Sequence, residues 1–148
     1  MGVEPFLVAS ALECVLAQRL ARKLCVRCKQ PYTPATDVLR EYGIESTDTL
    51  YRAAGCNHCS GTGYRGRVAI IELMTVTEEI ERLAVERRPA DDLRRAARAE
   101  GMRSLLEDGM RKVENGVTSI EEVLRILEGR ARETSDDGSS IVPIRAVG

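Results

Sequence analysis

Two pairs of cysteines constrain this chain more than any other feature of its sequence. Cys25 and Cys28 form one CxxC pair, Cys56 and Cys59 form another, and the 27 residues 29–55 separate them. Each pair presents two thiols from one tight turn, which is the pattern of a closed four-thiolate site for Zn²⁺. Four thiolates leave no coordination position for water. The sequence therefore predicts a metal that stabilises structure and takes no part in chemistry.

The alternative interpretation of a CxxC pair is a redox-active dithiol. That chemistry needs a cysteine of low pKa, and such a cysteine is typical of a helix N-terminus. Cys25 instead follows a predicted helix, whose C-terminal end disfavours a thiolate. Lys29, Arg27 and Arg65 are expected to offset the charge of the four thiolates. His58, the only histidine, is expected to be an exposed loop residue inside the second pair.

The fifth cysteine, Cys14, makes the cysteine count odd, which argues against the disulfide framework of a small secreted protein. We expect it to be a small buried side chain in a reduced, cytoplasmic protein. The net charge of −1 and the presence of only five aromatic residues disfavour nucleic acid as a partner. Neutralising phosphates needs excess positive charge, and stacking on bases needs aromatic side chains. Residues 5–17 are apolar but contain Glu13 and are too short to span a bilayer.

Apolar periodicity predicts an α+β protein that is mainly helical. Leucine and valine recur at steps of three and four along residues 12–24, so we expect one amphipathic helix over residues 6–24. The β-branched run at residues 68–71 predicts the one clear strand, buried on both faces. A strand needs a sheet, and we expect its partners to lie outside this sequence.

Helices are predicted for most of the remainder. A short helix over residues 36–42 ends at Gly43, and residues 46–51 add another turn. Further helices are expected over residues 77–86 and from Pro89 to just before Gly101. The pairs Ser104 with Glu107 and Thr118 with Glu121 have the capping-box spacing, and predict helices that end near residues 116 and 128. Together these helices form a predicted bundle, and residues 129–148 form a predicted disordered tail.

Four segments, VEPFLVAS, AQRL, GYRGR and TSIEEVLR, carry a larger resemblance. The chain resembles the C-terminal part of the type II secretion and type IV pilus assembly ATPases. This resemblance implies that residues 1–24 and 64–74 form the edge of a RecA-like α/β core. Residues 25–63 would be a zinc-binding insertion, and residues 75–128 a small helical bundle. Arg19, Arg67 and Glu72 would lie near the core in structural or intersubunit roles, with surface and strand-end salt bridges as the equal alternative.

The resemblance also implies the setting of the full-length protein: a homo-hexamer that binds ATP and Mg²⁺, is cytoplasmic, and is held at the inner membrane by a platform protein. One departure matters. No GxxxxGK[ST] phosphate loop and no acidic Walker-B strand occur in the sequence, so we expect that this chain alone does not hydrolyse ATP and is a piece of a longer motor.

Two other classes of function stay open. One is a stand-alone adaptor that docks its zinc-stapled module and helices on a partner. The other is a chaperone-like or nucleic-acid-binding zinc protein, since CNHCSGTG also matches the CxxCxGxG repeat of DnaJ-type chaperones. Within the motor interpretation, the sequence does not choose between protein secretion, pilus assembly and DNA uptake.

Overall fold

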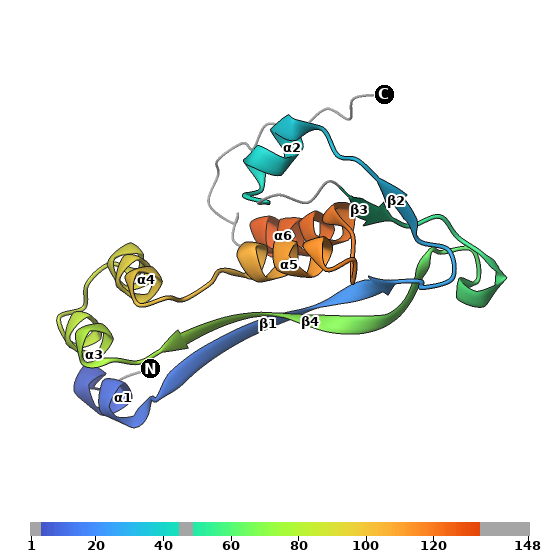
Figure 1. Cartoon of the computed structure of the whole chain (residues 1–148). Coiled ribbons are helices and arrows are strands. Elements are labelled where there is room, and N and C mark those ends of the chain that lie inside the picture. The colour runs from blue at the N-terminus through green and yellow to red at the C-terminus, as the bar shows by residue number, and fades with distance from the viewer. Residues whose placement is uncertain (1–3, 45–48, 134–148) are drawn as a thin grey trace.

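A long antiparallel ribbon of two strands runs through the molecule (Figure 1). The computed structural model describes residues 4–44 and 49–133. Strand β1 (Cys14–Leu24) pairs with strand β4 (Tyr64–Thr75), in register from Cys14 opposite Thr75 to Arg22 opposite Arg67. A bulge between Arg22 and Leu24 then sets Leu24 opposite Tyr64. The four clustered cysteines all lie in the excursion between these strands.

The prediction of one helix over residues 6–24 is wrong for most of its length. Helix α1 (Pro5–Ala11) ends early, and the chain continues as β1. Leu16, Leu20 and Leu24 are spaced by four residues, which suits one face of a helix and equally one face of a strand. The strand at residues 68–71 extends to the twelve residues of β4 and finds its partner in β1. The expectation that its partners lie outside this sequence was therefore also wrong.

The core lies where helices α5 (Leu105–Glu114) and α6 (Ile120–Glu133) cover one face of the ribbon (Figure 1). A second, small sheet of β2 (Gln30–Tyr32) and β3 (Leu50–Arg52) packs beside them, with helix α2 (Thr36–Glu41) as predicted. Of the extra turn predicted at residues 46–51, residues 46–48 lie outside the described residues, and Leu50 and Tyr51 belong to a strand instead. The buried core residues are Ala21, Ile44, Leu50, Ile70, Leu105, Met110, Val113, Ile120 and Val123.

The helices after the ribbon form two separate pairs rather than the single predicted bundle. Helix α3 (Glu78–Val85) packs against α4 (Ala90–Ala99) and against α1 at the opposite end of the ribbon from the cysteines (Figure 1). Helices α5 and α6 pack over its middle. The two pairs meet where Arg98 of α4 forms an ion pair with Glu107 of α5. The fold class of the described residues is α+β, as predicted.

Helix starts follow the local side-chain chemistry. The predicted capping box at Ser104 and Glu107 is confirmed, with both reciprocal hydrogen bonds present. The second box is not formed by Thr118 and Glu121. Ser119 Oγ accepts the N–H of Glu122 at 3.4 Å instead, one residue further along. Helix α6 also continues past residue 128 to Glu133, so the tail predicted to be disordered begins as helix. Residues 134–148 lie outside the described residues.

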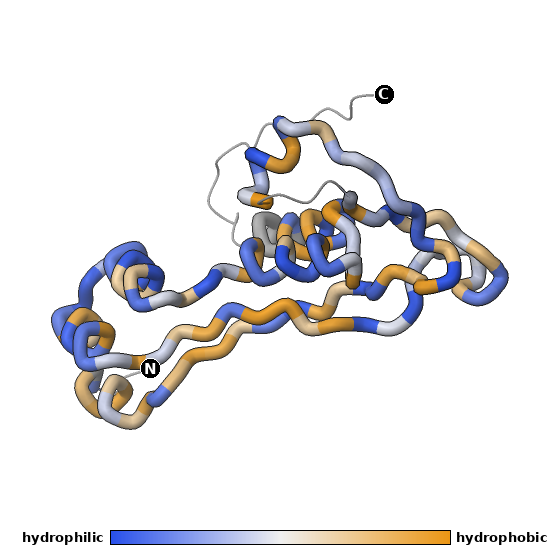
Figure 2. Tube along the Cα trace, in the orientation of Figure 1, coloured by the Kyte–Doolittle hydropathy of each residue, from blue (hydrophilic) through white to orange (hydrophobic). Residues whose placement is uncertain are grey.

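The face of the ribbon opposite α5 and α6 is apolar and open. Leu16 and Leu20 on β1 are 53% and 54% exposed, and Leu73 and Ile71 on β4 are 46% and 38% exposed. Leu16 lies directly opposite Leu73, so these four side chains share one face, which we call the open face. Figure 2 shows apolar residues along both strands, with no described element below them in that view. Of the helices in the described ranges, none is long and apolar enough to cross a membrane.

Gly109 sets how closely α5 approaches its neighbours, and substituting it tests this packing. A Cβ at this position would lie 2.7 Å from Val123 Cγ1 and 3.3 Å from Ile70 Cδ1. We expect Gly109→Leu to lower the free energy of unfolding by about 1–3 kcal/mol, because the core must move to admit the side chain. Arg111→Leu, on the exposed side of the same helix, should change it by less than about 0.5 kcal/mol. Urea titration followed by circular dichroism measures both, and equal effects would contradict the packing.

Candidate metal centre

The two CxxC pairs fold into two similar turns. In the first, the N–H groups of Cys28 and Lys29 donate to Cys25 O at 3.2 and 2.9 Å. In the second, the N–H groups of Cys59 and Gly61 donate to Cys56 O at 3.1 and 2.9 Å, through the short 3-10 helix η1 (Asn57–Cys59). Each turn holds its two thiols on the same side. The ribbon brings the turns together, because Cys25 directly follows β1 and its N–H donates to Gly63 O at 2.9 Å.

Gly63 is required by this close approach. Its backbone has φ +75°, and a Cβ there would lie 2.5 Å from the Cβ of Ala53. A side chain would therefore meet both left-handed backbone strain and a direct clash. The spacing of glycines after the second CxxC pair thus has a structural reason at this position.

The four sulfur atoms form one tight cluster. All of them lie within 4.8 Å of one another. The Sγ–Sγ distances are 4.0 Å for Cys25 to Cys56, 3.7 Å for Cys28 to Cys59 and 3.8 Å for Cys56 to Cys59. Tetrahedral thiolates at the Zn–S distance of about 2.3 Å are separated by about 3.8 Å, whereas a disulfide needs about 2.05 Å. The cysteines are free, and their arrangement fits a tetrahedral metal ion.

Hydrogen bonds to sulfur prepare the cluster for negative charge. Burial desolvates the Cys59 thiolate and raises its pKa, but the backbone N–H groups of Cys56 and Gly63, each 3.2 Å from Cys59 Sγ, outweigh burial and lower that pKa to about 6. Burial and the neighbouring sulfurs instead raise the pKa of Cys28 to about 12. Complete deprotonation of the cluster therefore needs a cation among the sulfurs, which is how metal binding and thiol ionisation are linked.

The cationic residues near the cluster are engaged elsewhere. Lys29 Nζ donates to Gly116 O at 2.9 Å and lies 4.2 Å from the centre of the Tyr51 ring. Arg65 donates to His58 O at 2.9 Å. His58 lies outside the sulfur cluster, and burial, followed by repulsion from Arg27 and Arg65, lowers its pKa. Charge compensation of the thiolates by these side chains stays a prediction.

Cys14 takes no part in the cluster. It lies at the start of β1, opposite Thr75, while Cys25 follows the other end of the strand, roughly 35 Å away at the usual rise per residue. Its side chain is exposed, so the expectation of a buried cysteine was wrong. That expectation depended on the helix that the structure replaces by a strand.

The other predicted site residues are spread along the ribbon. Arg19 lies opposite Ile70, and Arg67 lies opposite Arg22 with its side chain exposed. Glu72 Oε2 accepts the N–H of Leu105 at 3.2 Å, where a carboxylate suits the positive end of the α5 dipole. In the register of the ribbon, Glu72 lies two residues from Ile70, the partner of Arg19, and on the same face, whereas Arg67 lies on the other face. Their intersubunit role stays a prediction.

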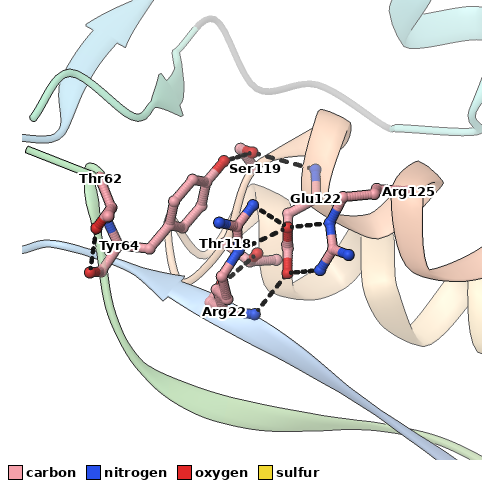
Figure 3. Close-up of polar contacts among 7 residues, drawn as sticks. All are labelled: Arg22, Thr62, Tyr64, Thr118, Ser119, Glu122 and Arg125. Carbon is pink, nitrogen blue, oxygen red and sulfur yellow. Dashed lines mark hydrogen bonds and ion pairs between the residues drawn. The ribbon is translucent and has the colours of Figure 1, made fainter.

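The most elaborate polar cluster was not predicted from sequence. The Glu122 carboxylate receives five hydrogen bonds, three from the Arg22 side chain and N–H and two from Arg125, at 2.7–3.0 Å (Figure 3). The Arg22 guanidinium lies 4.3 Å from the centre of the Tyr64 ring, and the Tyr64 hydroxyl hydrogen-bonds Ser119 Oγ at 2.8 Å. The only local signal was the capping-box pattern of TSIEE, which pointed to the neighbouring Glu121.

Glu122 is charged although its side chain has no solvent exposure. Burial raises the pKa of this carboxyl, but the hydrogen bonds from Arg125 and Arg22 outweigh burial and lower the pKa to about 2. A buried carboxylate with this many donors is costly to disturb, because removing a partner leaves an uncompensated charge. We call Arg22, Tyr64, Ser119, Glu122 and Arg125 the Glu122 junction.

The Glu122 junction predicts a specific loss of stability in acid. The folded-state pKa of about 2 lies below the ordinary value of 4.5, so ionisation of Glu122 stabilises the fold above pH 4.5, and this contribution is lost as pH falls toward 2. Between pH 6 and pH 2 the wild type should lose on the order of 3 kcal/mol more than Glu122→Gln. Glu121→Gln, one residue away and exposed, should follow the wild type. Urea titrations at each pH measure this, and parallel curves for all three proteins would contradict it.

The comparisons with known proteins agree on one family. The model of the type II/IV secretion system proteins matches residues 1–125. The chain is 44% identical over 128 residues to the type IV pilus assembly ATPase PilB of Thermus thermophilus, covering 84% of this chain and 14% of that protein. It is 48% identical over 126 residues to the type II secretion system protein HxcR of Pseudomonas aeruginosa, covering 85% and 24%. It is 41% identical to the type II secretion system ATPase E of Vibrio cholerae, covering 85% and 25%.

These matches confirm the resemblance seen in the sequence. The chain spans only about a seventh to a quarter of the curated relatives it matches. The shared segment includes the whole β1–β4 ribbon, the four clustered cysteines and the start of α6. The chain belongs to the family of type II/IV secretion system proteins.

Proposed function

We propose that this chain is the zinc-binding segment of a hexameric motor ATPase that powers type II secretion or type IV pilus assembly. The observation that carries the proposal is the cluster of four free thiols at tetrahedral spacing, held at the end of a ribbon that belongs to this family. In it Cys25, Cys28, Cys56 and Cys59 bind one Zn²⁺. The metal has no open position, so its contribution is to hold the excursion between β1 and β4 together.

The excursion between β1 and β4 needs a stabilising metal because it buries few apolar side chains. Among residues 25–44 and 49–63, Pro34 is buried, and the other buried apolar side chains outside the cluster are those of Ile44 and Leu50. Both of these side chains belong to the core under α5 and α6. A segment of this size with so few buried side chains is typical of folds that depend on a metal.

Metal analysis tests the proposed zinc site. The purified chain should contain one zinc ion per molecule, and Cys28→Ser or Cys56→Ser should reduce zinc content and lower the melting temperature, because three thiolates leave the tetrahedral set incomplete. Cys14→Ser is the matched control and should keep both at wild-type values, since Cys14 is exposed at the far end of β1. Mass spectrometry of metals and thermal melts measure the two quantities. A chain that is folded and free of zinc would refute the assignment.

The ribbon supports the second part of the proposal, in which β1 and β4 form the edge of a RecA-like core. Arg22 directs its N–H and C=O away from β4, toward Glu122 and Thr118. Because these groups alternate along an antiparallel strand, Leu20, Gln18 and Leu16 direct theirs the same way. Within the part of the chain that the structure describes, no other element pairs with that edge of β1 at these residues.

An unpaired edge beside an apolar face is a surface that proteins normally cover. The open face of Leu16, Leu20, Ile71 and Leu73 and the free edge of β1 together suit a further strand and a covering helix layer. The relatives named as ATPases are several times longer than the matched segment and have the chain to supply them. We propose that a catalytic core of this kind pairs with β1 and covers the open face.

The setting of the motor follows as part of the same proposal. ATP and Mg²⁺ would bind in the catalytic core, since the phosphate loop and Walker-B strand are absent from this sequence. The ring would be a homo-hexamer on the cytoplasmic side, and its partner an inner-membrane platform protein. No nucleic-acid partner is proposed.

A chimera distinguishes the motor segment from a stand-alone adaptor. We expect no ATP hydrolysis by the 148-residue chain alone. A PilB-type relative whose matching segment is replaced by residues 1–125 of this chain should hydrolyse ATP and assemble into hexamers. Leu16→Asp with Leu20→Asp should abolish both activities in the chimera, because charges would be buried against the core. Phosphate release and light scattering measure the outcome.

The same double substitution in the chain alone is the control. There the two side chains are exposed, so the melting temperature should change by only a few degrees. A chimera that is inactive and monomeric with the unsubstituted segment would favour the adaptor. ATP hydrolysis by the purified chain alone would refute the prediction that the catalytic groups lie outside it.

A further inference from the structure

The chain segment that enters the cysteine cluster is fastened to the loop before α6. Thr118 Oγ1 donates to Arg22 O at 2.8 Å, and the N–H of Leu24 donates to Val117 O at 2.8 Å. The next residue is Cys25, the first of the four clustered cysteines. A third hydrogen bond comes from the residue that follows the first CxxC pair. Lys29 Nζ donates to Gly116 O, in the same loop before α6, at 2.9 Å. The first CxxC turn is therefore held on both flanks by residues 116–118.

The chain segment that leaves the cluster is fastened to the same helix start. Gly63 donates its N–H to Cys59 Sγ at 3.2 Å and accepts the N–H of Cys25 at 2.9 Å, so one residue contacts both CxxC turns. Tyr64 follows it, and the Tyr64 hydroxyl bonds Ser119 Oγ at 2.8 Å (Figure 3). Both connections of the cluster to the ribbon thus end on residues 116–119, immediately before α6.

The buried Glu122 carboxylate joins these fastenings into one unit. Its five donors come from Arg22 on β1 and from Arg125 on α6, and the Arg22 guanidinium lies over the Tyr64 ring of β4. Figure 3 shows these side chains meeting between the two strands and the helix. A shift of β1 at this point would separate the carboxylate from Arg22, and a shift of β4 would separate Tyr64 from Ser119 and from the Arg22 guanidinium. The position of the strands beside the cluster and the position of α6 are therefore not independent.

We propose that the Glu122 junction couples metal binding at the four cysteines to the docking of α6 on the ribbon, so that each stabilises the other. This inference rests on the zinc site of the proposed function. If metal binding strengthens the docking of α6, then by thermodynamic reciprocity the docking of α6 strengthens metal binding by the same factor. Helix α3, at the opposite end of the ribbon, has no contact with the junction and serves as an internal reference.

Hydrogen exchange on the full chain tests the first direction. Zinc content is measured first, and the zinc-loaded protein is then compared with protein stripped by a chelator. We expect removal of zinc to speed amide exchange in residues 120–127 of α6 by about tenfold or more, and in α3 by less than about twofold. Unchanged exchange in α6 after complete loss of zinc would overturn the coupling and leave the zinc site intact. A folded chain that binds no zinc would fail at the first measurement and overturn the proposed site together with the coupling.

Zinc release tests the reverse direction. Glu122→Gln keeps the shape of the side chain and removes its charge, and should speed transfer of zinc to a chromophoric chelator by about tenfold. Glu121→Gln is the matched control and should release zinc at the wild-type rate. Tyr64→Phe removes one hydroxyl and should speed release by about threefold, which decides the question if Glu122→Gln does not fold. Release from Tyr64→Phe and from any folded Glu122→Gln protein at the wild-type rate would overturn the coupling.

Discussion

The antiparallel pairing of β1 with β4 determines where almost everything else in this molecule lies. Leu24 opposite Tyr64 is the last pair of the ribbon, and the two CxxC turns lie immediately beyond it. Because Gly63 bonds both Cys25 and Cys59, the end of the ribbon also sets the spacing of the sulfur cluster. The ribbon carries α1, α3 and α4 at its other end and the main core at its middle. A metal site made from residues 31 positions apart becomes local once these strands pair.

A buried ionic junction fixes α6 to this ribbon. Desolvation makes an isolated buried carboxylate unfavourable, and its attraction to arginine compensates only when the geometry is good and the lone pairs are used. Glu122 meets that condition with five hydrogen bonds from two guanidinium groups and one backbone N–H. Such a junction adds little to overall stability compared with an apolar replacement. Its hydrogen bonds do, however, favour the observed placement of the helix, which lies beside the strands that hold the cysteines.

The open face leaves apolar side chains exposed on one side of the ribbon. Two-stranded ribbons are marginal by themselves, and here α5 and α6 cover only one side. An apolar strip lies on the other side, made by Leu16, Leu20, Ile71 and Leu73. It lies next to an edge of β1 that pairs with no other strand among the described residues. The relatives are several times longer than the matched segment, and the proposal that the ribbon is the edge of a larger sheet rests on this surface.

Local sequence determined the features that depend on residues close together in the chain. The two CxxC pairs predicted which cysteines would cluster, and caps and glycines placed α2, α3, α4 and α5 to within two residues of their ends. Only the tertiary structure decided that residues 14–24 form a strand. Leu16, Leu20 and Leu24 fit the helical and the extended period equally well, and pairing with β4 selects the extended form. It also chose Glu122 over Glu121 as the buried acid, since that choice depends on Arg22, one hundred residues away. Short-range periodicity contains no information about such distant partners, whereas the burial of a charge depends entirely on them.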